Sequence, residues 1–356
     1  MRFTKALVLA QRPSFPSAGV STRGRASLLP APLRPVANRA LLSHALGWLG
    51  EAGVREVAVV VPEELAAEAR RAAADSPGTM SLSWLEQLPD EPLAQTIDDL
   101  TGFIDGQPFV LHLADSLARR SLRDVVAGAA DNNAEALLVV DAPAQAGGAE
   151  VVQLHATAGT GPAMRRRHRG SAGVAVLTGR ALEDVGSLDA PAEHVLEALA
   201  DRIEQRGGHV RTCSAGEWWR FRGGVDTLLE GNRFALERVR PDYACAQLVD
   251  SAIQGPVIAH PEARIESSTV RGPAVIGARA RLRDAYLGPY TSVGEDATIE
   301  GAEVENSMIL PGASITHLSG RLEASIVGVN ARVFNEFRLP RALRLNIGEG
   351  AQVCLS

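Results

Sequence analysis

The sequence has few of the residues and runs that mark secreted, membrane-spanning or metal-binding proteins. Its three cysteines, Cys213, Cys245 and Cys354, are spaced too widely for a metal-ligand pair or a redox motif. We therefore expect reduced cysteines that pack in the interior of a cytoplasmic protein. The apolar run at residues 6–10 is too short for a signal-peptide core or a membrane span, so no membrane partner is expected.

An excess of basic residues is also absent. The chain carries 36 Lys plus Arg against 42 Asp plus Glu, a formal net charge of -6, which gives no general attraction for nucleic acid or anionic lipid. Nucleic acid is therefore not expected as a partner. At 356 residues, of which 46% are hydrophobic, the chain exceeds the usual size of one hydrophobic core and should form two domains.

The first part of the chain alternates between apolar runs and amphipathic segments. Residues 5–10 form a continuous apolar run typical of a strand buried on both faces of a sheet, and residues 39–52 have the spacing of an amphipathic helix. The same alternation predicts strands at residues 54–61, 108–115, 134–140, 151–155 and 173–178, and a helix at 194–208. This order predicts a doubly wound, Rossmann-like α/β domain over residues 1–240, with ligands at the carboxyl ends of its strands.

The period of the sequence changes after Pro241. Aliphatic residues then recur at a period of about six, as at Ile276, Leu282, Val293 and Ile299, and glycine follows directly in Ile276-Gly277 and Val293-Gly294. Such a period with glycine at the turns is typical of a parallel β-helix, in which each coil stacks its aliphatic side chains on the coil below. The pattern predicts a hexapeptide-repeat domain over residues 241–356.

Six segments, spread over nearly the whole chain, carry a family resemblance. They are KALVLA at residues 5–10, PVANRALLSHALGWLGEAGV at 35–54, FVLHLADS at 109–116, GEWWRFRGGVDTLLEGNRFAL at 216–236, AYLGPYTSVGEDATIEGAEVENSMIL at 285–310 and RALRLNIGEGAQV at 341–353. In these segments the chain resembles the sugar-1-phosphate nucleotidyltransferases, above all the long-form glucose-1-phosphate thymidylyltransferases of actinobacterial antibiotic-sugar pathways. The resemblance implies a left-handed β-helix, Mg²⁺ as cofactor, and nucleotide and sugar-phosphate ligands. It also implies attack of a sugar phosphate on the α-phosphorus of a nucleoside triphosphate, a reaction catalysed mainly by positioning and charge neutralisation.

The phosphate-binding loop of that family should follow the first strand directly. Residues 11–18 instead hold polar side chains and prolines, which cannot let a phosphate approach the backbone as glycine does. A later candidate is Gly-Val-Ser-Thr-Arg-Gly-Arg at residues 19–25, with Ser21 and Thr22 as hydroxyl donors to the nucleotide and Arg23 as the catalytic cation. The alternative interpretation of this stretch is a solvated surface loop.

Two positions correspond to the metal-binding aspartates of the family. Asp115 matches the first, so the resemblance implies a catalytic Mg²⁺ ligand at the end of a buried strand, although an Asp there can also cap a following helix. Phe221 stands at the second, where the phenyl ring cannot ligate a metal, and Asp226 is a weak substitute. In the segment expected to contact the base, Gln95 is the candidate for hydrogen bonding.

Two lysines implied by the resemblance are missing. One position is occupied by Ala31, although Arg34 or Arg39 is near enough in sequence to compensate, and the other falls within residues 154–158. A run of arginines follows at residues 165–169, which either binds a phosphorylated ligand or forms a solvated face. The candidates for the sugar phosphate are Arg165, Arg167 and Arg169.

The sequence leaves three hypotheses for function. The first is a thymidylyltransferase-like protein of weak or lost activity, a pseudoenzyme that binds, scaffolds or regulates as a homo-oligomer or together with an active paralogue. The second is an active nucleotidyltransferase with a rebuilt loop that uses Arg23, Asp115, Mg²⁺ and the arginine run. The third is a transferase that reuses the pocket for another phosphorylated ligand. Acyl transfer by the β-helix is disfavoured, because His260 and His317 lie outside the regular repeat.

Overall fold

The chain folds into two compact units. The computed structural model describes residues 3–10, 30–75, 80–88, 100–127, 134–140, 171–186, 194–214, 216–244 and 246–335. The first unit, here called the α/β unit, contains the described residues of 1–14, 29–34 and 39–221. The second, the β-helix unit, contains residues 35–38 and the described part of 222–356. The predicted domain boundary at residue 240 stays a prediction.

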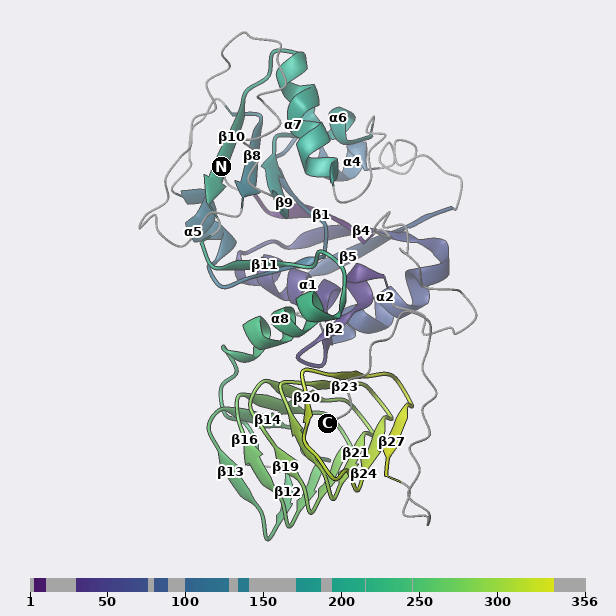
Figure 1. Ribbon diagram of the computed structural model, residues 1–356. Helices are drawn as coiled ribbons and strands as arrows, with labels where there is room; N and C mark the ends of the chain where they lie inside the picture. Colours follow the sequence, from purple (N-terminus) through teal and green to yellow (C-terminus); the bar gives the residue numbers. More distant parts are fainter. Residues whose placement is uncertain are drawn as a thin grey trace. The chain divides into compact units, whose positions relative to one another are not determined.

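A seven-stranded sheet forms the centre of the α/β unit (Figure 1), with strand order β10-β8-β9-β6-β1-β4-β5. The strands are β1 Lys5–Leu9, β4 Glu56–Pro62, β5 Ser81–Gln87, β6 Phe109–His112, β8 Ala136–Val140, β9 Ser171–Leu177 and β10 Val210–Ser214. All neighbouring strands pair in parallel except β9, which runs antiparallel to both β6 and β8. The sheet is therefore mixed rather than purely parallel. A separate antiparallel pair joins β7 (Ser116–Ala118) to β11 (Trp218–Arg220).

Helices cover both faces of this sheet (Figure 1). They are α1 Leu41–Glu51, α2 Ala66–Ala72, α4 Thr101–Ile104, α5 Leu122–Ala127, α6 Leu182–Gly186 and α7 Val195–Gln205, with short 3-10 turns at Ala31–Leu33, Glu63–Leu65, Ala73–Asp75 and Gly179–Ala181. Successive side chains of a strand point to opposite faces, so in β1 Ala6 and Val8 pack with α1, α2 and α5, whereas Leu7 and Leu9 pack with α4, α6 and α7. The core has two apolar layers, which explains why its strands read as continuous apolar runs.

Most of the predicted elements of the α/β unit are confirmed. The predicted helix at 39–52 is α1, that at 194–208 is α7, and the predicted strand at 173–178 is β9. Strand β5, at the edge of the sheet, was not predicted, because its positions are exposed or half-buried. The short strands β7 and β11 were not predicted either. The predicted strand at 151–155 lies outside the described residues.

The second unit is a left-handed parallel β-helix, as predicted. Three parallel sheets contain one strand from each coil, in the orders β12-β15-β18-β21-β24-β27, β13-β16-β19-β22-β25 and β14-β17-β20-β23-β26. Aliphatic residues at intervals of five or six positions, among them Ile265, Val270, Ile276, Leu282 and Leu287, are buried along its axis.

The strands of the β-helix are short and regular. They are β12 Gln247–Val249, β13 Ala252–Gln254, β14 Val257–Ala259, β15 Arg264–Glu266, β16 Thr269–Arg271, β17 Ala274–Ile276, β18 Arg281–Arg283, β19 Tyr286–Leu287, β20 Thr291–Val293, β21 Thr298–Glu300, β22 Glu303–Glu305, β23 Met308–Ile309, β24 Ser314–Thr316, β25 Leu322–Glu323, β26 Ile326–Val327 and β27 Arg332–Phe334. Helix α8 (Val225–Leu236) and the two-residue strand β2 (Pro35–Val36) belong to the same unit. Within the described ranges, no helix has the length and apolarity needed to cross a membrane.

Candidate functional site

Asp115 lies just beyond the carboxyl end of a central strand. Strand β6 ends at His112, and the chain turns through Leu113 and Ala114, whose φ of 52° is in the left-handed region. Parallel strands β1 and β6 are neighbours, so their carboxyl ends share the edge of the sheet at which Asp115 stands. This is the edge where doubly wound folds bind ligands. The local backbone therefore places the predicted aspartate where the sequence analysis expected a site.

Arg220 forms a buried ion pair with Asp115. Its Nε donates to Asp115 Oδ2 at 2.8 Å, and its Nη1 donates to the carbonyl oxygen of Ser171 at 3.0 Å. The two side chains are only 9% and 15% exposed. Their proximity follows from the β7–β11 register, which sets Arg220 opposite Ser116, the residue after Asp115. The guanidinium is thus fixed at the carboxylate by strand pairing and by a second hydrogen bond.

Glu197 and Gly173 also lie close to this ion pair. Glu197, on α7, accepts a hydrogen bond from the Ser171 N–H at 3.3 Å through Oε1. Gly173 has a φ of 80°, and a Cβ atom at this residue would stand 2.5 Å from Asp115 Oδ1. That close approach excludes any side chain at position 173. Three buried oxygens, Asp115 Oδ1, Ser116 Oγ and Glu197 Oε2, have no hydrogen-bond partner among the described residues.

Burial dominates the electrostatics of the site. It raises the pKa of Asp115, and the charge of Glu197 acts in the same direction, whereas Arg220 opposes both by its charge and its hydrogen bond. Burial also lowers the pKa of His112 to about 3, with a further contribution from the positive charge of Arg220. His112 is therefore a neutral imidazole at physiological pH. Its Nδ1 accepts a hydrogen bond from the Ala114 N–H at 2.8 Å, which stabilises the turn that carries Asp115.

Phe221 contacts Asp115 through its backbone, and Arg34 contacts the ring of Phe221. The backbone N–H of Phe221 donates to the Asp115 carbonyl oxygen at 2.8 Å, so position 221 lies directly beside the aspartate. The guanidinium carbon of Arg34 is 4.5 Å from the centre of the Phe221 ring, a cation–π contact. Arg34 Nε is buried and has no hydrogen-bond partner within the described ranges. The position implied for a second metal ligand thus holds an aromatic ring covered by an arginine.

The other predicted site residues cannot be placed against this geometry. Of the residues assigned a catalytic, nucleotide-binding, sugar-phosphate-binding or metal-binding role from the sequence, Asp115 alone is in the described part of the chain. The remainder lie outside the described residues and stay predictions: Ser21, Thr22, Arg23, Gln95, Arg165, Arg167 and Arg169. The possible compensating cations Arg34 and Arg39 and the weak substitute Asp226 are described as well.

Sequence reasoning missed the residues that surround Asp115. Arg220 could have been proposed as a site residue from the sequence, because it directly precedes Phe221 in a segment that carries the family resemblance. His112 and Glu197 had none, because each is embedded in a strand or helix pattern that explains it without a site. Their role depends on contacts between segments far apart in the chain.

The described residues do not fit Mg²⁺, the cofactor that the resemblance implies. Mg²⁺ prefers an octahedral shell of oxygens at about 2.0–2.1 Å and usually keeps several waters. Asp115 Oδ2 already accepts a hydrogen bond from the Arg220 guanidinium, and the two side chains are only 9% and 15% exposed. Within the described ranges, no group of three or more His, Cys, Asp or Glu side chains could hold a metal ion. The prediction of a metal-bound Asp115 therefore has no support in this geometry.

The low pKa of His112 gives a testable pH dependence. The unfolded chain takes up this proton below about pH 6.5, whereas the folded protein takes it up only near pH 3. The contribution of His112 to the free energy of unfolding is therefore fully present when the pH is above the pKa of the unfolded chain. It is lost as the pH falls toward the pKa of the folded protein. Between pH 7 and pH 5 this one group should cost about 2 kcal/mol of unfolding free energy. Urea unfolding of the wild type and of His112→Gln at both pH values measures it, and equal pH dependence in the two proteins would contradict the assignment.

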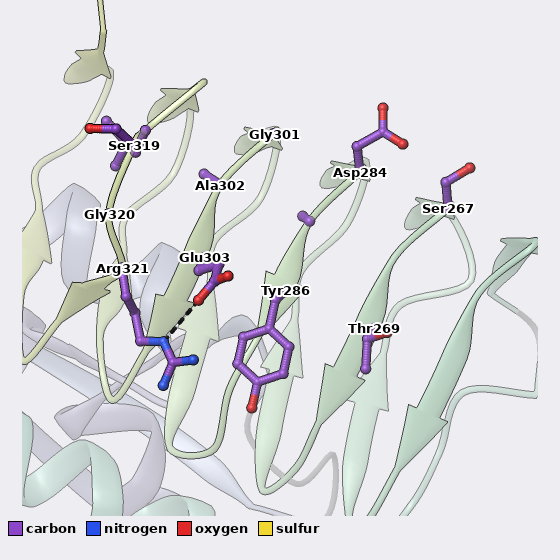
Figure 2. Close-up of a pocket in the computed structure, with 12 residues that line it drawn as sticks. Ser267, Thr269, Asp284, Tyr286, Gly301, Ala302, Glu303, Ser319, Gly320 and Arg321 are labelled. Atoms are coloured by element: carbon purple, nitrogen blue, oxygen red, sulfur yellow. Dashed lines mark hydrogen bonds and ion pairs between the residues drawn. The ribbon is translucent and has the colours of Figure 1, made fainter.

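A polar groove on the β-helix unit is a second candidate surface (Figure 2). It encloses about 690 Å³ along the sheet that contains β16, β19 and β22. Figure 2 shows Arg321 directed toward Glu303 and Tyr286, and Arg321 Nε is 3.1 Å from Glu303 Oε2. Arg321 also pairs with Glu305 at 2.9 Å, and its guanidinium carbon is 5.2 Å from the Tyr286 ring centre. Because Arg321 is already paired with both Glu303 and Glu305, the ligand site is not assigned to this groove.

Comparison with known proteins places the chain in a family. It is 32% identical over 335 residues to a glucose-1-phosphate thymidylyltransferase of Streptomyces griseus, an alignment that covers 91% of this chain and 93% of the relative. It is 28% identical over 331 residues to a glucose-1-phosphate thymidylyltransferase of Streptomyces antibioticus, with 89% and 91% covered. It is also 29% identical over 343 residues to the low-salt glycan biosynthesis nucleotidyltransferase Agl11 of Haloferax volcanii, with 92% and 94% covered. No model of a protein family matches the chain.

These similarities extend over both units and agree with the observed architecture. The chain belongs to the sugar-1-phosphate nucleotidyltransferase family. Membership establishes the fold and the general class, and the particular activity has to be argued from the site itself.

Proposed function

We propose that this protein binds a nucleotide or sugar phosphate in its α/β unit but performs little or no nucleotidyl transfer. The observation that carries the proposal is the buried ion pair between Asp115 and Arg220, with Phe221 held beside Asp115 by a backbone hydrogen bond. Family membership supports a phosphorylated ligand, since the relatives from Streptomyces are thymidylyltransferases for glucose 1-phosphate.

The loss of turnover follows from the chemistry of the reaction. Nucleotidyl transfer asks the protein to position two phosphates and to neutralise the charge that develops on pyrophosphate as it leaves. Removing a single electrostatic contact of this kind commonly costs a factor of about 10² to 10³ in rate. Here Phe221 stands where the resemblance implies a metal ligand, and Asp115 is already engaged by Arg220. Several such losses leave ground-state binding as the function that the site supports best.

The partner of the protein is part of the same proposal. A family member without turnover acts through what it binds, either as a homo-oligomer or beside an active paralogue, in a scaffolding or regulatory role. Mass measurement by sedimentation, with and without an active relative, tests this part of the proposal. A strictly monomeric protein that does not associate with such a relative would contradict it.

A pyrophosphate-release assay tests the central claim. The purified protein is mixed with dTTP or another nucleoside triphosphate, Mg²⁺ and glucose 1-phosphate, beside the Streptomyces griseus relative as a positive control. We expect turnover far below about 1 s⁻¹, the lower end of the ordinary enzyme range. A rate above that value would instead favour an active nucleotidyltransferase with a rebuilt loop.

A thermal-shift measurement tests ligand binding separately from turnover. Nucleoside triphosphates, sugar phosphates and nucleoside diphosphate sugars are each added to the protein without the second substrate. A ligand at 100 times its Kd should stabilise the folded protein by about 2.7 kcal/mol, which raises the midpoint of unfolding. No shift with any of these ligands would contradict the binding role and favour a purely structural one.

A further inference from the structure

Two arginines contact the two positions at which the family resemblance implies metal ligands: Arg220 pairs with Asp115, and Arg34 lies over the ring of Phe221. We propose that Arg220 and Arg34 are built-in cations that replace the divalent metal, so that the site binds the phosphate of its ligand without Mg²⁺. The inference rests on the proposed function, because it assumes that a phosphorylated ligand is bound. It goes beyond that function by assigning the groups that supply the positive charge.

The first built-in cation is Arg220. Its guanidinium is held by two hydrogen bonds, to Asp115 Oδ2 at 2.8 Å and to the Ser171 carbonyl oxygen at 3.0 Å, and its side chain is 9% exposed. A buried cation with fixed geometry neutralises the carboxylate permanently, as a bound metal would do reversibly. A metal ion added at Asp115 would have to displace this guanidinium or lie beside it with a like charge.

The second built-in cation is Arg34. Its guanidinium stacks on the Phe221 ring at 4.5 Å, and position 221 is beside Asp115 through the 2.8 Å backbone hydrogen bond. A ring surface orients a guanidinium without neutralising it, and a planar guanidinium binds phosphate through two parallel hydrogen bonds. No ion pair of Arg34 occurs in the part of the chain that the structure describes, and its buried Nε has no hydrogen-bond partner there. Among the described residues Arg34 therefore has no carboxylate partner, which leaves its charge available to an external anion.

The charges of the site balance without a metal. Asp115 and Glu197 supply the two carboxyl groups, and the charge of Glu197 raises the pKa of Asp115. Arg220 and Arg34 carry two positive charges, which together equal that of one divalent ion. In the absence of a bound phosphate, an added Mg²⁺ would leave an excess of positive charge at the site, which costs free energy in a medium of low dielectric constant.

The lysine content of the chain supports the same conclusion. Lys5 is the only lysine in the whole sequence, and its Nζ donates to the Phe103 carbonyl oxygen at 2.6 Å. Neither of the two lysine positions implied by the family resemblance can therefore be filled by a lysine from elsewhere in the chain. Any further side-chain cation at a ligand phosphate must therefore be an arginine or a histidinium.

A metal titration tests the exclusion of Mg²⁺ directly. Mn²⁺, which substitutes for Mg²⁺ and is observed by electron paramagnetic resonance, is titrated into the wild-type protein alone. We expect no stoichiometric binding. In the double variant Arg220→Leu with Phe221→Asp, which frees Asp115 and adds a carboxylate beside it, we expect Mn²⁺ binding that is lost again when Asp115→Asn is added. Stoichiometric binding to the wild type that disappears in Asp115→Asn overturns the proposal, and so does a folded double variant that binds no Mn²⁺.

A ligand titration tests the role of the arginines and does not depend on the double variant. Binding of dTTP and of inorganic pyrophosphate to the wild type is measured in EDTA and in Mg²⁺. We expect binding in EDTA that Mg²⁺ leaves unchanged or weakens, and a loss of about 10- to 100-fold in Arg34→Gln. The matched control is Arg55→Gln, an exposed arginine that precedes β4 at the opposite edge of the sheet.

The outcomes separate this inference from the proposed function. Binding that requires Mg²⁺, or that is equally strong in Arg34→Gln, overturns the built-in cations and leaves the ligand-binding role standing. Failure of both probes to bind under either condition overturns the ligand-binding role together with the inference. Turnover in the pyrophosphate assay with EDTA present would overturn the pseudoenzyme proposal and leave the metal-free site standing.

Discussion

Replacing Arg220 with methionine is expected to lower the free energy of unfolding of the α/β unit by about 3–5 kcal/mol. The substitution leaves the Asp115 carboxylate buried with no partner for Oδ2, and it leaves the Ser171 carbonyl oxygen without its donor. An uncompensated buried charge costs far more than the ion pair itself gains. Urea unfolding followed by tryptophan fluorescence measures the change in this unit alone, because all four tryptophans lie in it: Trp48, Trp84, Trp218 and Trp219.

Two further variants show whether the cost arises from the unpaired charge. Removing both partners, in Arg220→Met with Asp115→Leu, should restore much of the lost stability, because neither charge is then buried. Glu217→Gln is the matched control at the exposed end of the same strand pair, where Glu217 is 65% exposed and meets Arg119 at 3.0 Å. It should change stability by less than about 1 kcal/mol. A small effect of Arg220→Met, comparable with that of the control, would show that solvent reaches the pair.

The parts of the fold that were predicted correctly are those encoded by local repetition. In the β-helix, the aliphatic period places Ile276, Leu282 and Val293 on one axis, and all three are buried. In the α/β unit, apolar runs predict strands because both faces of the sheet are covered by helices. Strand β5 was missed because only part of each face is buried at the sheet edge, so its seven residues lack a continuous apolar run.

The candidate site could be predicted only in part because its chemistry depends on distant pairs. The strand-end position of Asp115 follows from the motif, and the structure places it there. Its engagement by Arg220 depends on the register between β7 and β11, which no spacing in the sequence determines. The same holds for His112. In the sequence it is one residue of an apolar strand, and only burial and the charge of Arg220 in the fold lower its pKa and keep it neutral. Residue types near a motif thus predict where a site lies. Which side chains pair with one another in the fold decides what that site can bind.

Asn232 is the second position where a single substitution should have a large effect. Its side chain is fully buried in the β-helix unit, where Oδ1 accepts from the Ala37 N–H at 2.9 Å and from Ser292 Oγ at 2.8 Å. Its Nδ2 donates to the Tyr290 carbonyl oxygen at 3.0 Å. One amide therefore links helix α8, the coil around Tyr290 and the segment 35–38. No aliphatic side chain of similar size can provide both a donor and two acceptor contacts.

Asn232→Leu is accordingly expected to destabilise the β-helix unit by about 2–4 kcal/mol, because the Ala37 N–H and the Tyr290 carbonyl group lose their buried partner. Ser292→Ala is the graded control, since it removes one hydrogen bond to Asn232 and leaves both backbone contacts intact. Hydrogen–deuterium exchange of peptides that cover residues 35–38 and α8 should accelerate strongly in Asn232→Leu and only slightly in Ser292→Ala. Equal exchange in the two variants would mean that segment 35–38 is held in place by other contacts.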